Sequence, residues 1–313
     1  MIEKISTKNM SREAWLAHRR NGIGGSDAAA VVGMSEYTSP YMLWCDKTGR
    51  SKETEETEAL RQGRDLEEYV AFRFSEATAK KVHRSNFMYK NTLYPWAQAN
   101  IDRLISGENA GLECKTTNVL NLKKFRNGEF PDRYYTQCIH YMAVTGADRW
   151  YLAVLVLGSD FKIYTIERDE DEIEALMTAE KDFWEDYVLA DKEPPMQGFP
   201  KESELVNTQY PCDNGETMEV PEMAGVLTNY FELKAMADEY KKRAEAVQNE
   251  IKAVMGECSC LLADGYKVTW KSQTRTSFDY KRLIEDNPDE DYSGYFNSSV
   301  SRTFRATQKK GDK

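Results

Sequence analysis

A regular run of apolar residues in the C-terminal third most constrains how this chain can fold. From Met223 to Val254, apolar side chains alternate spacings of three and four residues for over four heptads. This spacing is typical of the seam of a coiled coil or an antiparallel helix pair, so it predicts one long helix. The loop-like, proline-containing stretch from Pro194 to Pro221 precedes it. We therefore expect a first domain over residues 1–200 and an appendage over 201–313.

The net charge of the 313 residues is −10, which by itself argues against a nucleic-acid partner because Lys and Arg contacts to phosphate supply most non-specific affinity. The acidic residues are concentrated in one stretch, however. Residues 151–250 carry 24 acidic and 9 basic side chains, whereas residues 1–150 carry 19 acidic and 22 basic ones. The N-terminal half can therefore offer phosphate a basic surface.

Hydropathy and cysteine usage indicate the compartment. No run of about 18 apolar residues is present to span a bilayer, and the first residues lack the apolar stretch of a secretory signal. The cysteines are scattered, which predicts reduced thiols rather than a metal cluster. We expect a cytoplasmic protein without a membrane partner.

Helical and strand-like segments alternate in the N-terminal half, which predicts an α/β core. Expected helices cover 11–20, a segment opening at Ser26-Asp27, 57–78 and 132–144. Expected strands cover 96–105, 111–117, 150–157 and 162–167. After the long helix, strand-like 266–270 and 300–304 predict a small α+β cap.

An acidic residue two positions before a lysine is the sequence pattern that most suggests phosphodiester chemistry. The bare pattern is weak, because it ends at Lys115, Lys162, Lys234, Lys241, Lys252 and Lys281. The pattern at Lys281 starts an expected helix, and the pattern at Lys162 begins at a turn. The patterns at Lys234, Lys241 and Lys252 lie in the heptad helix, where acid–base pairs are ordinarily solvated. Only Glu113 and Lys115 lie within an expected strand. Alternation places them on one face.

Asp102 completes a possible metal site. Symmetric antiparallel pairing of 96–105 with 111–117 places Asp102 opposite Lys115 and diagonal to Glu113. Diagonal neighbours lie about 7 to 8 Å apart, which a cation between two carboxylates can bridge. Metal-activated water and charge neutralisation are what phosphodiester hydrolysis needs. A surface hairpin with a cross-strand ion pair fits the same pattern.

Two polar residues occupy helix positions that the apolar pattern reserves for the core. Glu67 lies in the stripe of Leu60, Gly63, Val70 and Phe74, where an unpaired carboxylate needs a cation, a donor or a proton. Alternatively, Glu67 lies at the edge of the stripe and Leu66 is the core residue. Gln137 lies between Tyr134 and Tyr141 on one helix face, where it could hold water or phosphate or be a satisfied buried amide.

A glycine-rich turn predicts a phosphate site near the N-terminus. Gly22 to Asp27 leads directly into a helix, and backbone N–H groups at a helix N-terminus attract anions. Gly25 lets phosphate approach, and Arg19 and Arg20 stand just before the turn. Arg20 with the Ser26 hydroxyl could clamp a terminal phosphate. An ordinary capped corner between two helices is the alternative.

The order of these motifs resembles the YqaJ family of viral recombinases, which groups with lambda exonuclease in the PD-(D/E)XK nuclease superfamily. The resemblance covers about residues 11–195 and is carried by Trp15 to Arg20, Gly22 to Ala29, Gly63 to Glu67, Asp102 with Glu113-Cys114-Lys115, and Tyr134 to Gln137. It implies a restriction-endonuclease-like core, a mixed central sheet flanked by helices. The superfamily's proline before the first acid is absent, since Asn100-Ile101 precedes Asp102.

The resemblance also implies an activity and its site residues. The activity is Mg²⁺-dependent 5′-to-3′ digestion of one strand of linear duplex DNA, leaving a 3′ single strand. Asp102, Glu113 and the backbone carbonyl of Cys114 would bind metal, with Glu67 near a second ion or its water, and Mn²⁺ could substitute. Lys115 would orient or activate the attacking water, and Gln137 would assist. Arg20 and Ser26, with Arg19 and Gly25 beside them, would hold the 5′-phosphate.

Partners and alternatives follow from the same resemblance. It implies a ring-shaped homo-oligomer, possibly a trimer, that threads DNA, and a RecT-type single-strand annealing protein as partner. A structure-specific or restriction-like endonuclease could use the same metal site. A non-catalytic DNA-end-binding scaffold is disfavoured by the intact set of Asp102, Glu113 and Lys115. The heptad helix and tail could serve oligomerisation, partner docking or DNA guidance.

Overall fold

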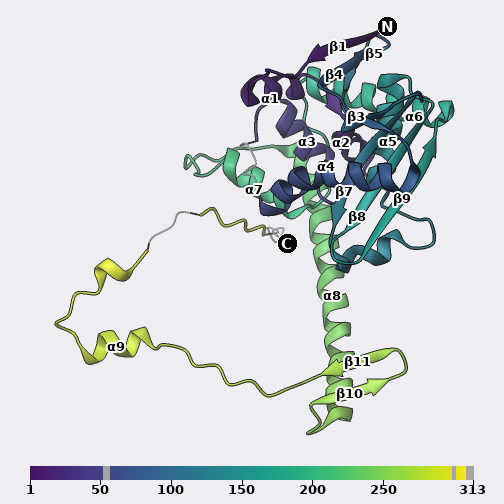
Figure 1. Ribbon diagram of the computed structural model, residues 1–313. Helices are drawn as coiled ribbons and strands as arrows, with labels where there is room; N and C mark the ends of the chain where they lie inside the picture. Colours follow the sequence, from purple (N-terminus) through teal and green to yellow (C-terminus); the bar gives the residue numbers. More distant parts are fainter. Residues whose placement is uncertain (52–56, 298–300, 308–313) are drawn as a thin grey trace. The chain divides into compact units, whose positions relative to one another are not determined.

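The computed structural model describes residues 1–51, 57–297 and 301–307 (Figure 1). The chain forms two compact units, Met1–Tyr210 and Pro211–Lys313. Within the described ranges, no helix is both long and apolar enough to cross a membrane.

Two β-sheets form the framework of the first unit. A four-stranded sheet has the order β1-β4-β5-β2 and a five-stranded sheet the order β3-β6-β7-β8-β9. The first consists of β1 (Ile2–Ser6), β2 (Ile23–Gly24), β4 (Phe87–Asn91) and β5 (Tyr94–Asn100). The second consists of β3 (Val82–Arg84), β6 (Arg103–Ile105), β7 (Ala110–Thr117), β8 (Arg149–Val156) and β9 (Asp160–Glu167). Strands β7 and β8 are parallel and the other neighbours in that sheet antiparallel, so the sheet is mixed.

Helices surround these sheets, and most begin at a side chain that caps them. Ser11, Ser39, Thr57 and Asp169 each accept a backbone N–H of the first helical turn. The α-helices are α1 (Arg12–Arg20), α2 (Gly25–Val31), α3 (Pro40–Lys47), α4 (Glu58–Thr78), α5 (Asp132–Thr145), α6 (Glu170–Phe183) and α7 (Pro200–Gln209). A 3-10 helix, η1 (Val119–Phe125), follows β7, and a π-helical turn, η2 (Trp184–Leu189), follows α6.

Strand β8 is buried on both faces, and its side chains separate the two main clusters of the core. Trp150, Leu152 and Val154 pack with residues of α5, whereas Tyr151 and Ala153 pack with Val70 and Phe74 of α4. Since successive side chains of a strand point to opposite faces, α4 and α5 cover opposite faces of the five-stranded sheet. The expected flanked mixed sheet is thereby confirmed. So are the helices expected over 57–78 and 132–144 and the strands expected over 111–117, 150–157 and 162–167.

The single strand expected over 96–105 is wrong. The chain leaves β5 at Asn100, passes through Ile101 and Asp102, and enters β6 in the other sheet. Ile101 is buried in the cluster beside α5, whereas Arg103 pairs with carboxylates of α4 on the opposite side of the five-stranded sheet. These opposite demands explain why the strand breaks, and they place Asp102 at the junction of the two sheets.

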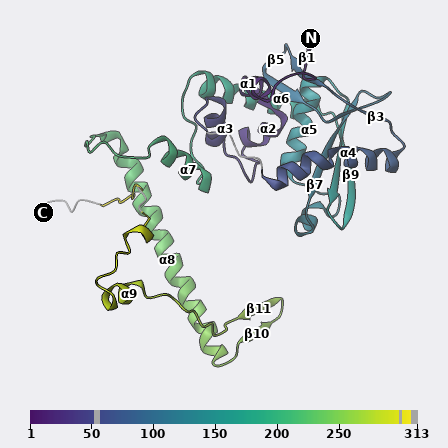
Figure 2. The ribbon, with the colours of Figure 1, turned by 60° about the vertical axis from the view of Figure 1, so that its left-hand side comes forward.

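The second unit is built on one long helix, α8 (Ala224–Met255), as the heptads predict (Figure 2). A short hairpin of β10 (Cys260–Ala263) and β11 (Tyr266–Thr269) follows it, which confirms the strand expected near 266–270. The remaining short helices are η3 (Pro221–Met223), α9 (Tyr280–Asp286) and η4 (Ser293–Tyr295). Of the strand expected over 300–304, residue 300 lies outside the described residues, and 301–304 is irregular.

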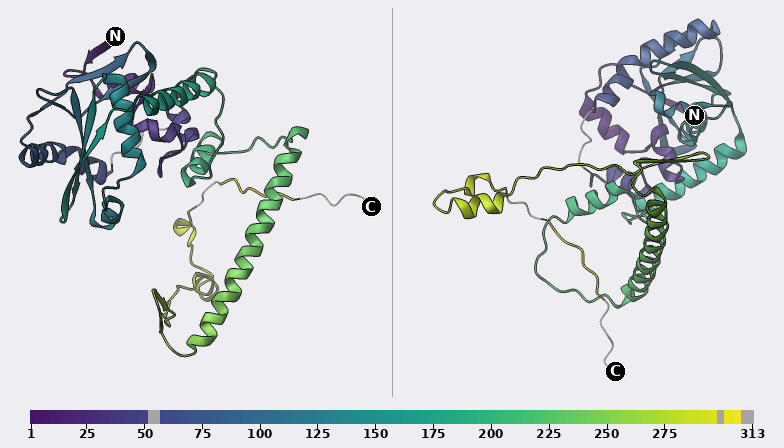
Figure 3. Two further views of the ribbon diagram at one scale, coloured as in Figure 1. Left: turned by 90° about the vertical axis from the view of Figure 1, so that its right-hand side faces the viewer. Right: turned by 90° about the horizontal axis from the view of Figure 1, so that it is seen from below.

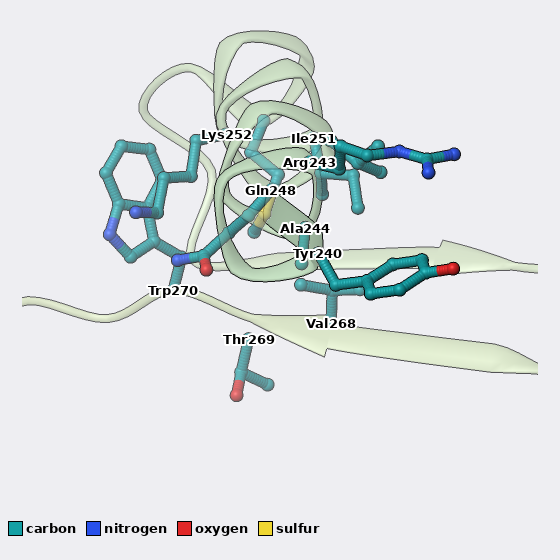
Figure 4. A pocket seen from close by; sticks show the side chains of 11 residues that line it. Tyr240, Arg243, Ala244, Gln248, Ile251, Lys252, Val268, Thr269 and Trp270 are labelled. Carbon is teal, nitrogen blue, oxygen red and sulfur yellow. The ribbon is translucent and has the colours of Figure 1, made fainter. Parts of the chain in front are cut away.

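The hairpin lies at the C-terminal end of α8 (Figure 3). Side chains of the helix and the hairpin line an apolar groove (Figure 4). Val247 and Ile251 of the helix and Val268 of β11 line it. Trp270 borders one end, where the Lys252 ammonium lies 5.8 Å from its ring centroid. Beyond the groove, towards the start of α8, seam residues such as Val226 and Leu233 are exposed.

Candidate active site

The hairpin of β6 and β7 brings the predicted acidic residues together, but in a different register from the one expected. Arg103 pairs with Leu112 and Leu104 with Gly111. Continued by one residue, this register sets Asp102 against Glu113, so the expected pairing of Asp102 with Lys115 is wrong. The turn is centred on Gly107 and Glu108, one residue earlier than symmetric pairing assumes. Because the shift is two residues, Glu113 and Lys115 keep their face.

Asp102 is tied to β7 through a backbone amide. Its Oδ2 accepts a hydrogen bond from Cys114 N at 2.8 Å. In an extended strand, the N–H and C=O of one residue point to the same side. The carbonyl of Cys114 therefore faces the Asp102 side of β7, as a metal ligand would have to if the resemblance assigns its role correctly.

Glu113 is held by the helix that crosses behind it. Gln137 of α5 donates from Nε2 to Glu113 Oε1 at 2.8 Å and to the Tyr141 hydroxyl at 2.8 Å. Both N–H groups of the amide are thus used, which fixes its orientation. Gln137 is therefore a buried amide whose N–H groups both donate hydrogen bonds, which is the second of the two interpretations that the sequence allowed. Through that bond it also positions a residue of the site.

Lys115 is the cation of the cluster. Its Nζ lies 2.5 Å from Glu113 Oε1 and 5.3 Å from the ring centroid of Tyr134. Burial alone would lower the pKa of Lys115, but Glu113 and Asp102 raise it above its ordinary value. The ammonium is therefore charged at neutral pH.

The carboxylates of this cluster have fewer positive partners than they need. Burial, followed by the charges of Glu113 and Glu67, raises the pKa of Asp102 well above its usual range. Glu113 Oε2 is buried and, among the described residues, has no hydrogen-bond partner. Two carboxylates with an orphaned oxygen, beside a strand carbonyl, are the donors that Mg²⁺ prefers. They fit a divalent cation, although within the described part of the chain no three acidic, His or Cys side chains form a ready-made metal cluster.

Glu67 projects from α4 towards this hairpin and has a protein cation as its partner. Arg103 donates from Nη1 to Glu67 and to the backbone carbonyl of Asp102, and from Nη2 to Glu68 at 2.8 Å. The Arg103 guanidinium is buried, and the sequence reasoning missed it. An arginine at the alternate position between the apolar Ile101 and Ile105 is the signal that could have found it.

The glycine-rich turn from Gly22 to Asp27 packs directly on α5, the helix that carries Gln137. A Cβ on Gly25 would lie 2.5 Å from Cε1 of Tyr141, so only glycine fits at the start of α2. The Tyr141 hydroxyl accepts from Gln137, which in turn holds Glu113. A chain of direct contacts therefore joins the turn to the carboxylate cluster.

Asp27 of this turn is buried and fully paired. Its Oδ2 lies 2.6 Å from Lys47 Nζ and accepts from Gly24 N at 3.0 Å, and its Oδ1 lies 3.3 Å from Arg19. Burial alone would raise the pKa of Asp27, but Lys47 and Arg19 lower it far below its usual value. The hydrogen bond from Gly24 N to Asp27 caps α2, as expected if the turn is an ordinary capped corner between two helices. Asp27 and Lys47 were also missed as partners by the sequence reasoning.

The two arginines before the turn have different surroundings. Arg19 donates to Ser26 Oγ at 2.9 Å and pairs with Asp27, so Ser26 contacts Arg19 rather than Arg20. Both arginines line a cavity of about 580 Å³ with Arg12 and Lys201, and the acidic residues Asp27, Asp46 and Glu204 line it too. Within the described ranges, no hydrogen bond or ion pair engages the Arg20 guanidinium. Arg20 is thus the arginine free to meet a ligand.

The fold is an α/β fold with a mixed sheet, helices on both faces, and a hairpin that carries Asp102 and Glu113-Cys114-Lys115, which is the arrangement that the resemblance to PD-(D/E)XK nucleases implies. The model of the YqaJ-like viral recombinase domain matches residues 14–148. The uncharacterized protein YqaJ of Bacillus subtilis (strain 168) is 35% identical over 293 residues, which cover 91% of this chain and 92% of that protein. The chain therefore belongs to the YqaJ family, as the motifs predicted.

Two solved structures are similar to part of this chain. The alkaline exonuclease LHK-Exo from Laribacter hongkongensis has 21% sequence identity and a TM-score of 0.49, covering 57% of this chain and 93% of that one. A phage related exonuclease from Haemophilus somnus 129PT has 12% identity and a TM-score of 0.41, covering 57% of this chain and 100% of that one.

Proposed function

We propose that this protein is a Mg²⁺-dependent nuclease that digests linear double-stranded DNA from 5′ to 3′ and leaves a 3′ single strand. One observation carries the proposal. The buried Glu113 carboxylate uses one oxygen for Gln137 and Lys115, while its other oxygen has no partner among the described residues. A carboxylate left short of positive charge beside Asp102 suits an exchangeable divalent cation.

Asp102, Glu113 and the carbonyl of Cys114 would hold this cation. Glu67 would lie near a second Mg²⁺ or its water, and Mn²⁺ could replace Mg²⁺. When bound, the metal supplies a water of lowered pKa and neutralises charge on the scissile phosphate. Gln137 keeps Glu113 in place for this task through its 2.8 Å hydrogen bond.

Lys115 acts as a fixed positive charge in this scheme. In the metal-free site, Glu113 and Asp102 raise the pKa of Lys115, which favours its ammonium form. As an ammonium, Lys115 would donate hydrogen bonds to the attacking water or to a phosphate oxygen. Its Nζ is already within hydrogen-bonding distance of Glu113.

The glycine-rich turn would receive the 5′-phosphate. Arg20 lines the cavity beside this turn with Arg12, Arg19 and Lys201, and these four basic side chains outnumber the acidic ones that line it, Asp27, Asp46 and Glu204. Arg19 holds Ser26 beside the turn. Arg20 is accordingly the proposed clamp, with Ser26, Arg19 and Gly25 shaping its surroundings.

The family's description as viral recombinases supports a role in homologous recombination. The 3′ strand would be the substrate of a RecT-type single-strand annealing protein. We further propose a ring-shaped homo-oligomer, possibly a trimer, around the DNA, and an address in the cytoplasm of a bacterium or a phage-infected bacterium. The PD-(D/E)XK-like site and the membership of the YqaJ family support the nuclease activity. The partner, the ring and the compartment are further proposals that follow from the resemblance.

An assay on end-labelled linear and closed circular duplex DNA, with Mg²⁺ or with chelator, tests this function. We expect degradation of the linear duplex with Mg²⁺, faster with a 5′-phosphate than with a 5′-hydroxyl, and intact circles. Undiminished cutting of circles would favour an endonuclease with the same site. Binding of ends without any cleavage would favour a scaffold.

A further inference from the structure

A buried histidine and glutamate lie outside the proposed chemistry. His140 of α5 and Glu180 of α6 are both 0% exposed. His140 Nδ1 lies 2.7 Å from Glu180 Oε1, and His140 Nε2 lies 3.0 Å from the backbone carbonyl of Gln98. A buried ionisable pair is costly unless its hydrogen bonds are made, so this arrangement demands a structural reason.

The contacts of the imidazole fix where its protons lie. A carbonyl only accepts, so Nε2 must carry a hydrogen and donate it to Gln98. The short contact between Nδ1 and Glu180 likewise contains a proton, on the imidazole or on the carboxyl. Burial alone would lower the pKa of His140, but Glu180 raises it, and burial raises the pKa of Glu180. The pair therefore retains this proton, and the ring has one orientation that supports Gln98.

Gln98 of β5 extends this support to the end of α1. Its Nε2 lies 3.0, 2.9 and 3.2 Å from the backbone carbonyls of His18, Arg19 and Gly22. The last carbonyls of a helix lack partners within the helix and need donors from elsewhere. Gln98 is fully buried, so water does not supply these donors in its place.

Arg20 is the last residue of this helix and precedes the turn directly. Its guanidinium lines the cavity and has no partner of its own in the described part of the chain. Nothing local therefore holds its side chain, and its position depends on where the end of α1 lies. Gln98 and Lys47, which donates to the Arg19 carbonyl at 3.0 Å, determine that position.

We propose that Glu180, His140 and Gln98 form a positioning network that holds the C-terminal end of α1 so that Arg20 meets the 5′-phosphate of the DNA end. The network does not touch the substrate. It runs from α6 through α5 and β5 to α1. The inference rests on the proposed recognition of a 5′-phosphate.

Gln98→Met is the sharpest test, because it removes the donors to three carbonyls without leaving a buried charge. The matched control is Asn91→Leu. Asn91 is also buried and donates to the carbonyl of Ala143 on α5 at 3.2 Å, but among the described residues its hydrogen bonds do not reach α1. Both variants lose buried hydrogen bonds from neighbouring strands of the four-stranded sheet, so comparing their melting temperatures measures the purely structural loss.

The measurement is the kcat/KM of Mg²⁺-dependent digestion on linear duplex with a 5′-phosphate and with a 5′-hydroxyl. For Gln98→Met we expect the ratio of the two to fall about tenfold, through KM on the phosphorylated end. For Asn91→Leu we expect the wild-type ratio, and His140→Gln, which keeps a donor towards Gln98, should retain most of it. An equal ratio in Gln98→Met and wild type would overturn the network alone. A wild type without any phosphate preference would instead overturn the proposed end recognition, and the network with it.

Discussion

Two buried carboxylate sites of the first unit differ in how their charge is balanced. Asp27 has two cations, Lys47 and Arg19, and a backbone amide, and its pKa is lowered. Asp102 shares its surroundings with the carboxylates of Glu113 and Glu67, and its pKa is raised by burial and by these charges. Both sites contain a lysine. They differ in the ratio of carboxylates to cations, which is lower around Asp27 than around Asp102.

The difference separates a structural site from a functional one. The pairs around Asp27 are complete, so they stabilise the turn, and the Asp27 carboxylate needs no further cation. The cluster around Asp102 has an oxygen of Glu113 without a partner among the described residues, so a further cation would improve its energy. Each of the following changes alters one side of this contrast.

The largest effect is expected for Lys115→Ala. We expect cleavage of linear duplex to fall by about three orders of magnitude, because the fixed charge beside the reacting phosphate is lost. DNA binding, measured by fluorescence anisotropy, should remain. Lys162→Ala is the matched control, since Lys162 ends the same acidic-x-lysine pattern in an exposed pair, 2.8 Å from Asp160. Equal activity in both variants would place the active site elsewhere.

The second comparison exchanges the two aspartates for asparagine in the presence of chelator. Asp27→Asn leaves Lys47 buried without its counter-charge, so we expect a loss of about 3 to 5 kcal/mol of unfolding free energy. Asp102→Asn removes one of several crowded negative charges, so we expect unchanged or higher stability. Urea unfolding measures both. Destabilisation of equal size in the two variants would refute the charge contrast.

The pH dependence of stability gives a third prediction. The pKa of Asp27 in the folded protein is lower than its ordinary value of 3.8, so its contribution to stability is present above that pH. The contribution is lost as the pH falls from 3.8 towards the lowered pKa. The unfolding free energy of wild type should therefore approach that of Asp27→Asn in this acidic window and exceed it near neutrality. A difference that stayed constant with pH would contradict the assigned ion pairs.

The smallest expected effect separates the two neighbouring arginines. Arg20→Ala should lower the preference for 5′-phosphorylated over 5′-hydroxyl ends about tenfold and leave the melting temperature near that of wild type. Arg19→Ala should lower the melting temperature, because Arg19 holds Ser26 and Asp27. Digestion rates on the two ends, with a thermal melt of each variant, test this. Identical behaviour of the two variants would refute the division of roles.

Much of the site could be predicted from the sequence, because strand alternation fixes which residues share a face. Glu113 and Lys115 share a face whatever the pairing, and this survived an error of two residues in the register. The register itself depends on where the turn is centred, which propensities do not decide. The partners Arg103, Lys47 and Gln98 could not be predicted, because they reach carboxylates and carbonyls that are distant in sequence. Glu67 shows the limit: its need for a cation was predicted, but Arg103 supplies one.

Asp102 lies where the chain crosses from one sheet to the other. It is joined covalently to β5 of the first sheet and is hydrogen-bonded to β7 of the second. A cation shared by Asp102 and Glu113 would therefore cross-link the two sheets at their junction. Amide hydrogens along β6 and at the start of β7 should then exchange with solvent more slowly when Mg²⁺ is added. Hydrogen exchange would thus detect loading of the centre without any DNA present.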